Sequence, residues 1–453
     1  MIRKFWLVLA AGVFAAAALT RATPVAAADD ERINELERKV DVLTAEIEQL
    51  RLGAAADTAL LSVGPRSGLG PAASKVYGTT HGVSLGGYGE MLYENFDRER
   101  EDGTPSAALD RLDFLRMVLY VGHKFSDELL LNSEVEFEHA GVTDQGTVEG
   151  TSDPLTGEVS GDAELSGEAV VEFAYLEWSR KPVFGIRAGM LLVPMGLTNE
   201  QHEPTVFLGA RRSEVEQLII PTTWSANGAG VIGDLPNGLS YRLYLTEGLN
   251  GANFTANGIR EGRQGGSQSL FTQPAVTGRL DYAARGGATL GASFFAGNTW
   301  QDFQPAGGTL APRLSLIDVH GRLDWRGVQA RALYAHGSLT DVSELSDALG
   351  LTGSERLGES FFGATVEASY DLLGRFAPGS NYALLPYVRW ESYDTQNGVP
   401  GGTENPALER EVWTAGAAFR PHPNVIVKAD RQWRSNQADT AFDQWNLAVG
   451  YMF

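Results

Sequence analysis

Hydrophobic and polar residues alternate strictly along the last stretch of the chain, residues 443–453. One face of an extended strand here would carry Trp445, Leu447, Val449, Tyr451 and Phe453. The other face would carry Gln444, Asn446, Ala448, Gly450 and Met452. Side chains of a strand point alternately to opposite faces. An apolar face with aromatics near both ends, opposite a small or polar face, predicts a strand with lipid on one side and a watery interior on the other.

The same period-two pattern recurs upstream, for example over residues 129–138, 276–282 and 317–325. In each run, charged residues occupy one face and large apolar residues the other. The apolar faces are too continuous, strand after strand, to be merely the core of a small sandwich.

Connections between these strands alternate in length. Seven short connections carry turn residues, around 126–127, 181–182, 235–238, 285–287, 326–327, 373–381 and 421–424. Eight mostly longer, polar or Gly-rich connections lie between them, at about 96–109, 140–167, 191–227, 247–274, 297–312, 338–359, 394–408 and 434–442. This order predicts an all-β fold, a transmembrane antiparallel barrel of about 16 strands over residues 82–453. A soluble β-sandwich or propeller is the alternative, but neither requires connections that alternate in length.

Residues 29–52 follow a different period and predict a short α-helical coiled coil before the barrel. Heptad positions a and d carry Ile33, Leu36, Val40, Leu43, Ile47 and Leu50. β-Branched residues at a with Leu at d favour dimers. A single amphipathic helix on the barrel or the membrane is the alternative.

The N-terminus has the pattern of an export signal. Arg3 and Lys4 precede an apolar stretch over residues 5–19, and small residues at 26–28 offer a cleavage site. We therefore expect a signal peptide over residues 1–28. Residues 53–81 are rich in Ala, Gly, Ser and Pro and show neither the period of a helix nor that of a strand. They are predicted to be a flexible linker.

Composition excludes several classes of site and partner. The chain of 453 residues contains no cysteine, so disulfides and cysteine-based metal sites or nucleophiles are excluded. Its formal net charge is −21. That charge becomes more negative once a signal peptide carrying three basic and no acidic residues is removed, so nucleic acid is not an expected partner. We expect no metal and no cofactor.

Particular residues connect the chain to a known class of barrel. The sequence Gly-Gly-Tyr-Gly-Glu spans residues 86–90, Arg-Ala-Gly-Met spans 187–190 before a Pro-Met-Gly bend at 194–196, and Tyr451 precedes a terminal Phe453. The chain resembles the phosphate-selective porin O/P family over about residues 82–453. Its coiled coil resembles that of trimeric porins linked to dicarboxylate uptake.

The resemblance implies a location in the bacterial outer membrane, in contact with its lipid, with the coiled coil in the periplasm. It implies a homotrimer, in conflict with the dimer preference of the coil itself. The implied function is a water-filled channel for passive diffusion of small hydrophilic solutes, with phosphate or dicarboxylates as candidates. Phosphate sites of this family use lysines, whereas this chain has only six lysines.

The longest connection, at about 191–227, is the third of the long ones, and in general porins this loop folds into the barrel and narrows it. Its candidate constriction residues are Glu200, His202, Glu203, Arg211 and Arg212. An apolar stretch at 218–221 could pack against the barrel wall. The alternative is an outside loop that packs between subunits.

Cations predicted to face the interior are candidate pore-lining residues: Arg116, Arg187, Arg242, Arg279, Arg322, Arg331, Arg389 and Lys428. Rings of charge select ions in pores, and arginine forks dock carboxylate or phosphate. The alternative for each is a local ion pair with a neighbouring carboxylate.

Two other functions remain open from the sequence. A barrel linked to the cell wall through its coiled coil would serve as a structural tether. A barrel enzyme would need a nucleophile and a base that converge on one rim. The seven histidines are scattered, and His202-Glu203-Pro204 is not a zinc-binding pattern, so we expect no enzymatic activity.

Overall fold

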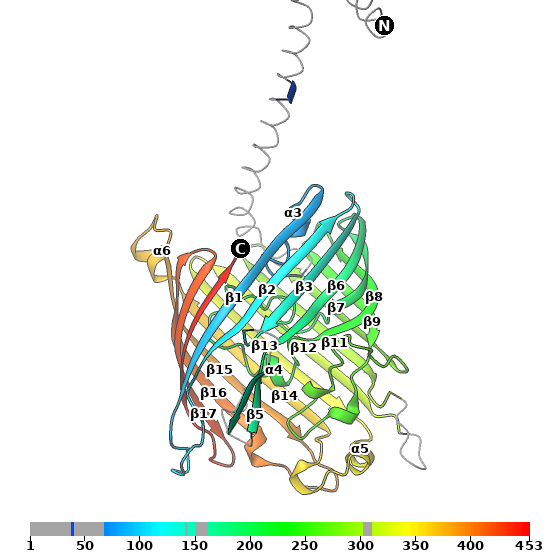
Figure 1. The fold of residues 1–453 in the computed structure, drawn as a ribbon, viewed down its shortest axis with the longest axis vertical. Helices are drawn as coiled ribbons and strands as arrows, with labels where there is room; N and C mark the ends of the chain where they lie inside the picture. The colour runs from blue at the N-terminus through cyan, green and yellow to red at the C-terminus, as the bar shows by residue number, and fades with distance from the viewer. Residues whose placement is uncertain (1–37, 40–67, 141–143, 150–161, 302–309) are drawn as a thin grey trace, which may run out of the picture. The chain divides into compact units, whose positions relative to one another are not determined.

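A closed antiparallel barrel of 16 strands forms the body of the computed structural model, as the alternation of hydrophobic and polar residues predicted. The structure describes residues 38–39, 68–140, 144–149, 162–301 and 310–453 (Figure 1). The barrel strands are β1 (Gly82–Phe96), β2 (Arg111–Lys124), β3 (Leu129–Glu138), β6 (Glu168–Lys181), β7 (Phe184–Leu192), β8 (Ser225–Asp234), β9 (Leu239–Glu247), β10 (Pro274–Ala283), β11 (Ala288–Asn298), β12 (Arg313–Trp325), β13 (Val328–Leu339), β14 (Ser360–Tyr370), β15 (Ala383–Asn397), β16 (Glu409–His422), β17 (Val425–Asn436) and β18 (Gln444–Met452). The barrel closes where β1 pairs with β18, with Tyr88 opposite Met452.

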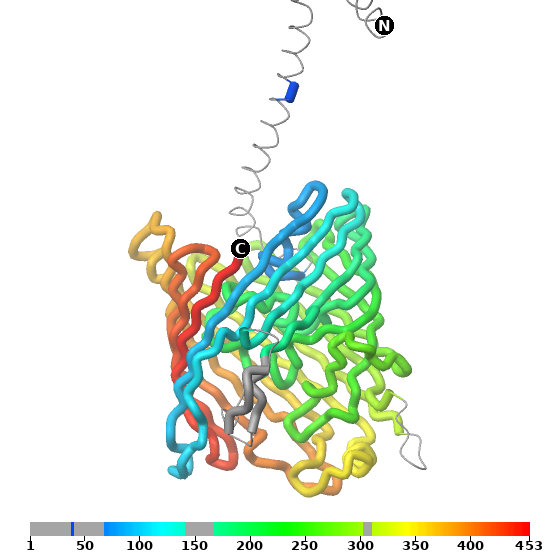
Figure 2. The backbone as a smooth tube through the Cα atoms, in the orientation of Figure 1, coloured from blue at the N-terminus to red at the C-terminus, as the bar shows by residue number. Residues whose placement is uncertain are grey.

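Connections alternate between the two ends of the barrel, as predicted. Short turns lie at the end that also holds the C-terminus, and the long connections lie at the other end (Figures 1 and 2). We call these the short-turn end and the long-loop end. The short-turn end includes α6 (Leu372–Phe376), and the long connections include a hairpin of β4 (Asp144–Glu149) and β5 (Asp162–Ser166), α5 (Val342–Ala348) and the single turns η1 (Gly251–Asn253), η2 (Arg260–Gly262), η3 (Gly353–Glu355) and η4 (Pro406–Leu408).

The outer face of the barrel is apolar along the strands. On β18, Trp445, Leu447 and Val449 are 50%, 48% and 39% exposed, while the residues between them are buried. Cross-strand register places Trp390 beside Trp413 and Trp413 beside Trp433, so tryptophans form a row near the long-loop end. Aromatic rows at the edges of an apolar band are typical of barrels in a membrane.

The predicted signal peptide lies outside the described residues, as does the predicted coiled coil except for residues 38 and 39, which are helical. Of the predicted linker, residues 68–81 are described, and they include α3 (Lys75–Gly78). Within the described parts of the chain, no helix is both long and apolar enough to cross a membrane.

Candidate functional site

The connection between β7 and β8 runs inside the barrel. We call residues 193–224 the inner loop; its single helical turn is α4 (Val215–Leu218). Val193, Met195, Ile219 and Ile220 are each 0% exposed. This long connection therefore lies among inward-facing side chains of the wall, and it narrows the interior.

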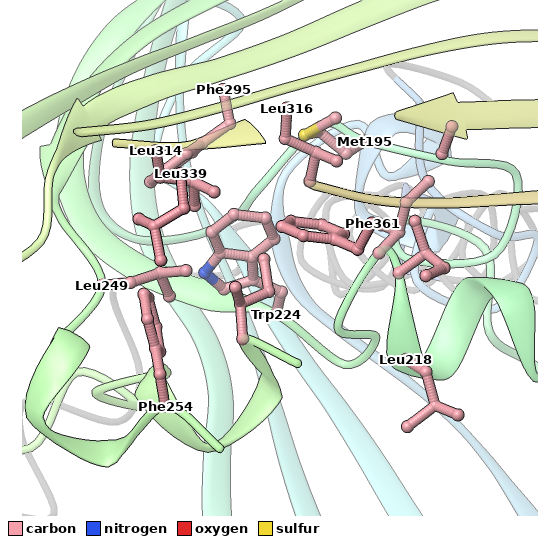
Figure 3. Close-up of a cluster of buried hydrophobic side chains, with 14 of the residues drawn as sticks. Met195, Leu218, Trp224, Leu249, Phe254, Phe295, Leu314, Leu316, Leu339 and Phe361 are labelled. Atoms are coloured by element: carbon pink, nitrogen blue, oxygen red, sulfur yellow. The ribbon is translucent and has the colours of Figure 1, made fainter. Parts of the chain in front are cut away.

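Apolar contacts anchor the inner loop to one side of the wall. Trp224 lies at the centre of a buried cluster (Figure 3), with its ring 4.5 Å from that of Phe295 on β11. Leu314 and Leu316 on β12 and Phe361 on β14 belong to the same cluster. These inward positions contact protein rather than water. The alternating runs singled out in the sequence did not include these three positions, whose apolar partner is the inner loop.

Cations of the barrel wall hold the loop by its peptide carbonyls. The Nζ atom of Lys428 donates to the carbonyl oxygen of Gly209 at 2.9 Å, and Nη1 of Arg389 donates to that of Arg211 at 3.1 Å. Arg279, Arg322 and Arg331 donate in the same way to Gly196, Leu197 and Val206. Arg420, which the sequence analysis did not single out, donates to Thr205 at 3.1 Å. These predicted pore-lining cations therefore position the loop.

Carboxylates of the wall accept hydrogen bonds from the same loop. Asp318 accepts from the Gly196 amide at 3.1 Å, and Asp430 from the Ala210 amide at 2.7 Å. Glu391 accepts from the Ser213 hydroxyl at 2.6 Å. Wall groups of both signs thus satisfy buried polar groups of the inner loop.

Ion pairs account for most of the remaining candidate residues. Arg116 lies 3.3 Å from Glu136, and Arg187 lies 2.8 Å from Glu177. Arg242 lies 3.1 Å from Glu200 and 3.0 Å from Asp281. Further pairs join Arg279 to Asp281 at 2.7 Å, Arg389 to Glu391 at 2.8 Å and Arg211 to Glu94 at 3.1 Å, and the imidazole of His202 is within hydrogen-bond distance of Glu134, at 2.9 Å. These charges are therefore paired with neighbouring side chains. They do not form a ring of unpaired charges around the pore.

Three arginines at the long-loop end have no carboxylate within ion-pair distance among the described residues. Arg212 donates to the His202 carbonyl oxygen at 3.0 Å, Arg260 to that of Gln217 at 3.0 Å, and Arg263 to that of Arg260 at 3.1 Å. Only Arg212 was a sequence candidate for the constriction. Burial and the neighbouring Arg263 lower the pKa of Arg260 to about 9, so its guanidinium stays charged at neutral pH.

Two cavities bring these arginines near acidic residues. A cavity of about 440 Å³ is lined by Arg212 and Arg260 and by Glu90 and Glu94 of β1. A second, of about 690 Å³, is lined by Arg260, Arg263 and Glu172 of β6. Glu261, next to Arg260 on the same connection, lines both cavities, and Arg111 and Arg116 of β2 also line the first. Charges of both signs therefore lie together around each cavity.

The segment before β1 also lies inside the barrel, which the sequence did not reveal. Glu203 of the inner loop accepts hydrogen bonds from the Ala72 and Ala73 amides at 2.9 and 3.0 Å. The hydroxyl of Tyr77 donates to Glu177 at 2.6 Å. A run of small residues without period gave no signal for this contact, so Glu203 was predicted to line the constriction rather than to hold the chain's own backbone.

Ser293 and His320 lie near each other but do not form a hydrogen-bonded nucleophile and base pair. Ser293 donates its hydroxyl hydrogen bond to Asp318 and not to His320. His320 lies between two carboxylates, Asp318 at 2.5 Å and Asp281 at 3.0 Å. The described residues contain no group of side chains suited to a metal ion.

Comparison with known proteins places the fold among porins. No family model matches the chain. OmpF of Salmonella typhi, solved in complex with daunomycin, is 14% identical over 83% of this chain and 98% of that one, with a TM-score of 0.51, a likeness that shows the fold alone. An anion-selective porin from Comamonas acidovorans is 10% identical over 82% and 99% of the two chains, with a TM-score of 0.47.

Sequence similarity extends along most of one bacterial protein. An uncharacterised protein of Aquifex aeolicus, strain VF5, is 35% identical over 398 residues, which cover 86% of this chain and 84% of that protein. This chain, whose described residues form a barrel of porin fold, therefore belongs to the same family as the Aquifex aeolicus protein.

Proposed function

We propose that this protein is an outer-membrane porin that forms a water-filled channel for passive diffusion of small hydrophilic solutes. The observation that carries the proposal is the closed barrel of 16 strands with an apolar outer band and a charged interior narrowed by the inner loop. Barrels of about 16 strands are too wide for inward-facing side chains to fill, so they can leave an aqueous channel.

The charges at the long-loop end support anions as the preferred solutes. Arg212, Arg260 and Arg263 line the two cavities without a paired carboxylate among the described residues. An incoming carboxylate or phosphate could dock on their guanidinium groups. Acidic residues line the same cavities, so the preference would come from docking of a solute's anionic group on these arginines and not from a uniformly positive lining. Phosphate and dicarboxylates, the solutes that the family resemblance suggests, meet this description.

Reversal potentials in a salt gradient test the solute preference. We expect the triple variant Arg212→Gln, Arg260→Gln, Arg263→Gln to lose anion preference relative to the unmodified protein, because the unpaired positive charge is gone. The matched control is Arg285→Gln, Arg326→Gln, Arg375→Gln, which removes the same charge from exposed positions at the short-turn end. Equal reversal potentials in the two triple variants would contradict the proposed role of the cavity arginines.

We also propose a homotrimer in the outer membrane, with residues 29–52 as a periplasmic coiled coil. The heptad seam supports the assembly, since a cyclic oligomer lets parallel helices meet on one axis. Solute transport without covalent chemistry is proposed in preference to enzymatic activity because Ser293 donates to Asp318 and not to the neighbouring His320.

A further inference from the structure

The short-turn mouth of the barrel holds a piece of the chain's own N-terminal side. Residues 68–78, which we call the plug, end in α3 beside β1, β2 and β3 (Figure 1). Leu69, Ala72, Ala73 and Val76 are between 1% and 3% exposed, although only Val76 lies in regular structure. Their burial comes from inward-facing side chains of the wall and from the inner loop.

The plug is bound on the side of the inner loop through its backbone. Besides the two amides that donate to Glu203, the Gly70 amide donates to the Glu200 carbonyl oxygen at 3.2 Å. The Gln201 side chain donates to the Gly68 carbonyl oxygen at 3.0 Å. A buried carboxylate that accepts two peptide amides makes charge-assisted hydrogen bonds, which are stronger than neutral ones.

Wall strands bind the opposite side of the plug. Asn132 of β3 donates to the Ala73 carbonyl oxygen at 3.0 Å. The Tyr77 hydroxyl lies 3.0 Å from that of Tyr175 on β6, and Arg187 on β7 donates to it at 2.9 Å. Strands β3, β6 and β7 thus form, together with the inner loop, one binding site for this segment.

Glycines of the wall fit the plug closely. A Cβ atom on Gly122 of β2 would lie 2.7 Å from Cβ of Val76, and one on Gly86 of β1 would lie 3.1 Å from the carbonyl oxygen of Ala72. Any side chain at Gly122 would therefore collide with the plug. The steric fit is an observation independent of the hydrogen bonds, and both indicate a specific docked position.

An open volume remains beside the plug. A cavity of about 520 Å³ at the short-turn end is lined by Tyr77, Glu177 and Arg242. The plug therefore borders the space through which a solute would leave the interior. The plug and this space together occupy the cross-section of the barrel at the short-turn end.

We propose that residues 68–78 are a plug that limits the conductance of the channel, and that the barrel conducts more when a substitution removes the segment from its site under Glu203. The proposal rests on the channel function proposed above. The docked plug reduces the open cross-section at the short-turn mouth, and its release adds the volume that its buried side chains occupy.

The test displaces the plug without altering the barrel. Val76→Asp puts a carboxylate where no water reaches, and burying an unpaired charge is strongly unfavourable, so the segment should leave its site. Thr80→Asp adds the same charge at an exposed position of the same connection and is the control. Because the chain has no cysteine, Ser74→Cys, at a position only 3% exposed, reports plug release by its reaction with a maleimide.

Purified full-length protein carrying Ser74→Cys is measured in planar bilayers with and without each aspartate. We expect maleimide labelling and a larger single-channel conductance for Val76→Asp, and neither change for Thr80→Asp. Labelling without a rise in conductance would overturn the proposal. Protection of Ser74→Cys in the Val76→Asp variant would also overturn it, because the segment would then be a fixed part of the wall.

A covalent lock gives the converse measurement. A disulfide between Val76→Cys and Gly122→Cys needs the two Cβ atoms to move apart by about 1 Å, toward the usual separation. Oxidised channels that also carry Ala73→Asp, a charge at another buried position of the plug, should keep the conductance of the unmodified protein, and reduction of the disulfide should raise it. A larger conductance in the locked state would contradict the proposal. Failure of the unmodified protein to conduct at all would instead refute the channel function.

Discussion

At the scale of single residues, charged side chains of the interior act mainly on the inner loop. Arg389 is 3% exposed and serves both Glu391 and the Arg211 carbonyl oxygen. Within the loop, Glu216 accepts hydrogen bonds from the Leu197 and Thr198 amides at 2.5 and 2.7 Å. A carboxylate that bridges two parts of a loop in this way stabilises the loop's shape independently of the wall contacts.

Replacing this carboxylate should loosen the loop. Glu216→Ala leaves two buried amides without an acceptor, and we expect it to destabilise the docked loop by about 2–4 kcal/mol. Faster trypsin cleavage after Arg211 or Arg212 measures the loss. Glu355→Ala, at an exposed position, is the control and should cleave at the unmodified rate. Equal rates for both variants would show that Glu216 does not hold the loop.

The sequence predicted which charged residues face the interior, but it did not predict the groups that they contact. Arg116, Arg187 and Arg389 face inward as their strand positions predict. Their contacts depend on the strand register and on the path of the inner loop, which a period of two does not specify. Arg260 and Arg263 lie on a connection without any period, so their place beside the cavities could not be predicted from the pattern.

At the scale of elements, the inner loop is held by an apolar anchor as well as by charges. Trp224→Ala would leave a cavity in the cluster around Phe295, and such substitutions cost about 3–5 kcal/mol. We expect a correspondingly lower unfolding temperature in detergent. Trp445→Ala, on the outer face and 50% exposed, is the matched control and should shift that temperature less. The opposite order would mean that the loop does not pack in this cluster.

The elements differ in how well the sequence predicted them. Strands and their alternating connections were recoverable because period and turn residues both marked them, as on β3, β12 and β18. The plug was not, because its glycines and alanines dock by backbone hydrogen bonds and close fit, and neither property leaves a hydrophobic pattern. Only contacts from residues far along the chain, such as Glu203, hold it in place.

At the scale of the whole molecule, the apolar band predicts that the barrel contacts lipid. Val449→Arg, midway along β18, should destabilise the folded barrel by about 2–4 kcal/mol in lipid vesicles. Ser435→Arg, on the outer face of β17 beyond Trp433, should cost only about 0–1 kcal/mol because the interface is hydrated. Denaturant unfolding from vesicles compares them. Equal costs at the two positions would contradict a membrane-spanning band.

Oligomeric state is a second prediction at this scale. We expect the mass of the detergent-solubilised complex to equal three chains, and removal of residues 29–52 to lower the stability of that trimer while the barrel stays folded. A mass of two chains would show that the dimer preference of the heptad seam prevails. An effect of the deletion on envelope integrity alone, with an intact trimer, would favour the tethering role.

The most direct test of the account is the current through the purified full-length protein in a planar lipid bilayer. We predict stepwise increases in conductance as single oligomers insert, because the barrel encloses a charged interior that the inner loop narrows but does not remove. Folded, heat-modifiable protein that inserts and carries no ionic current, or protein that stays soluble in water without detergent, would contradict the proposed channel.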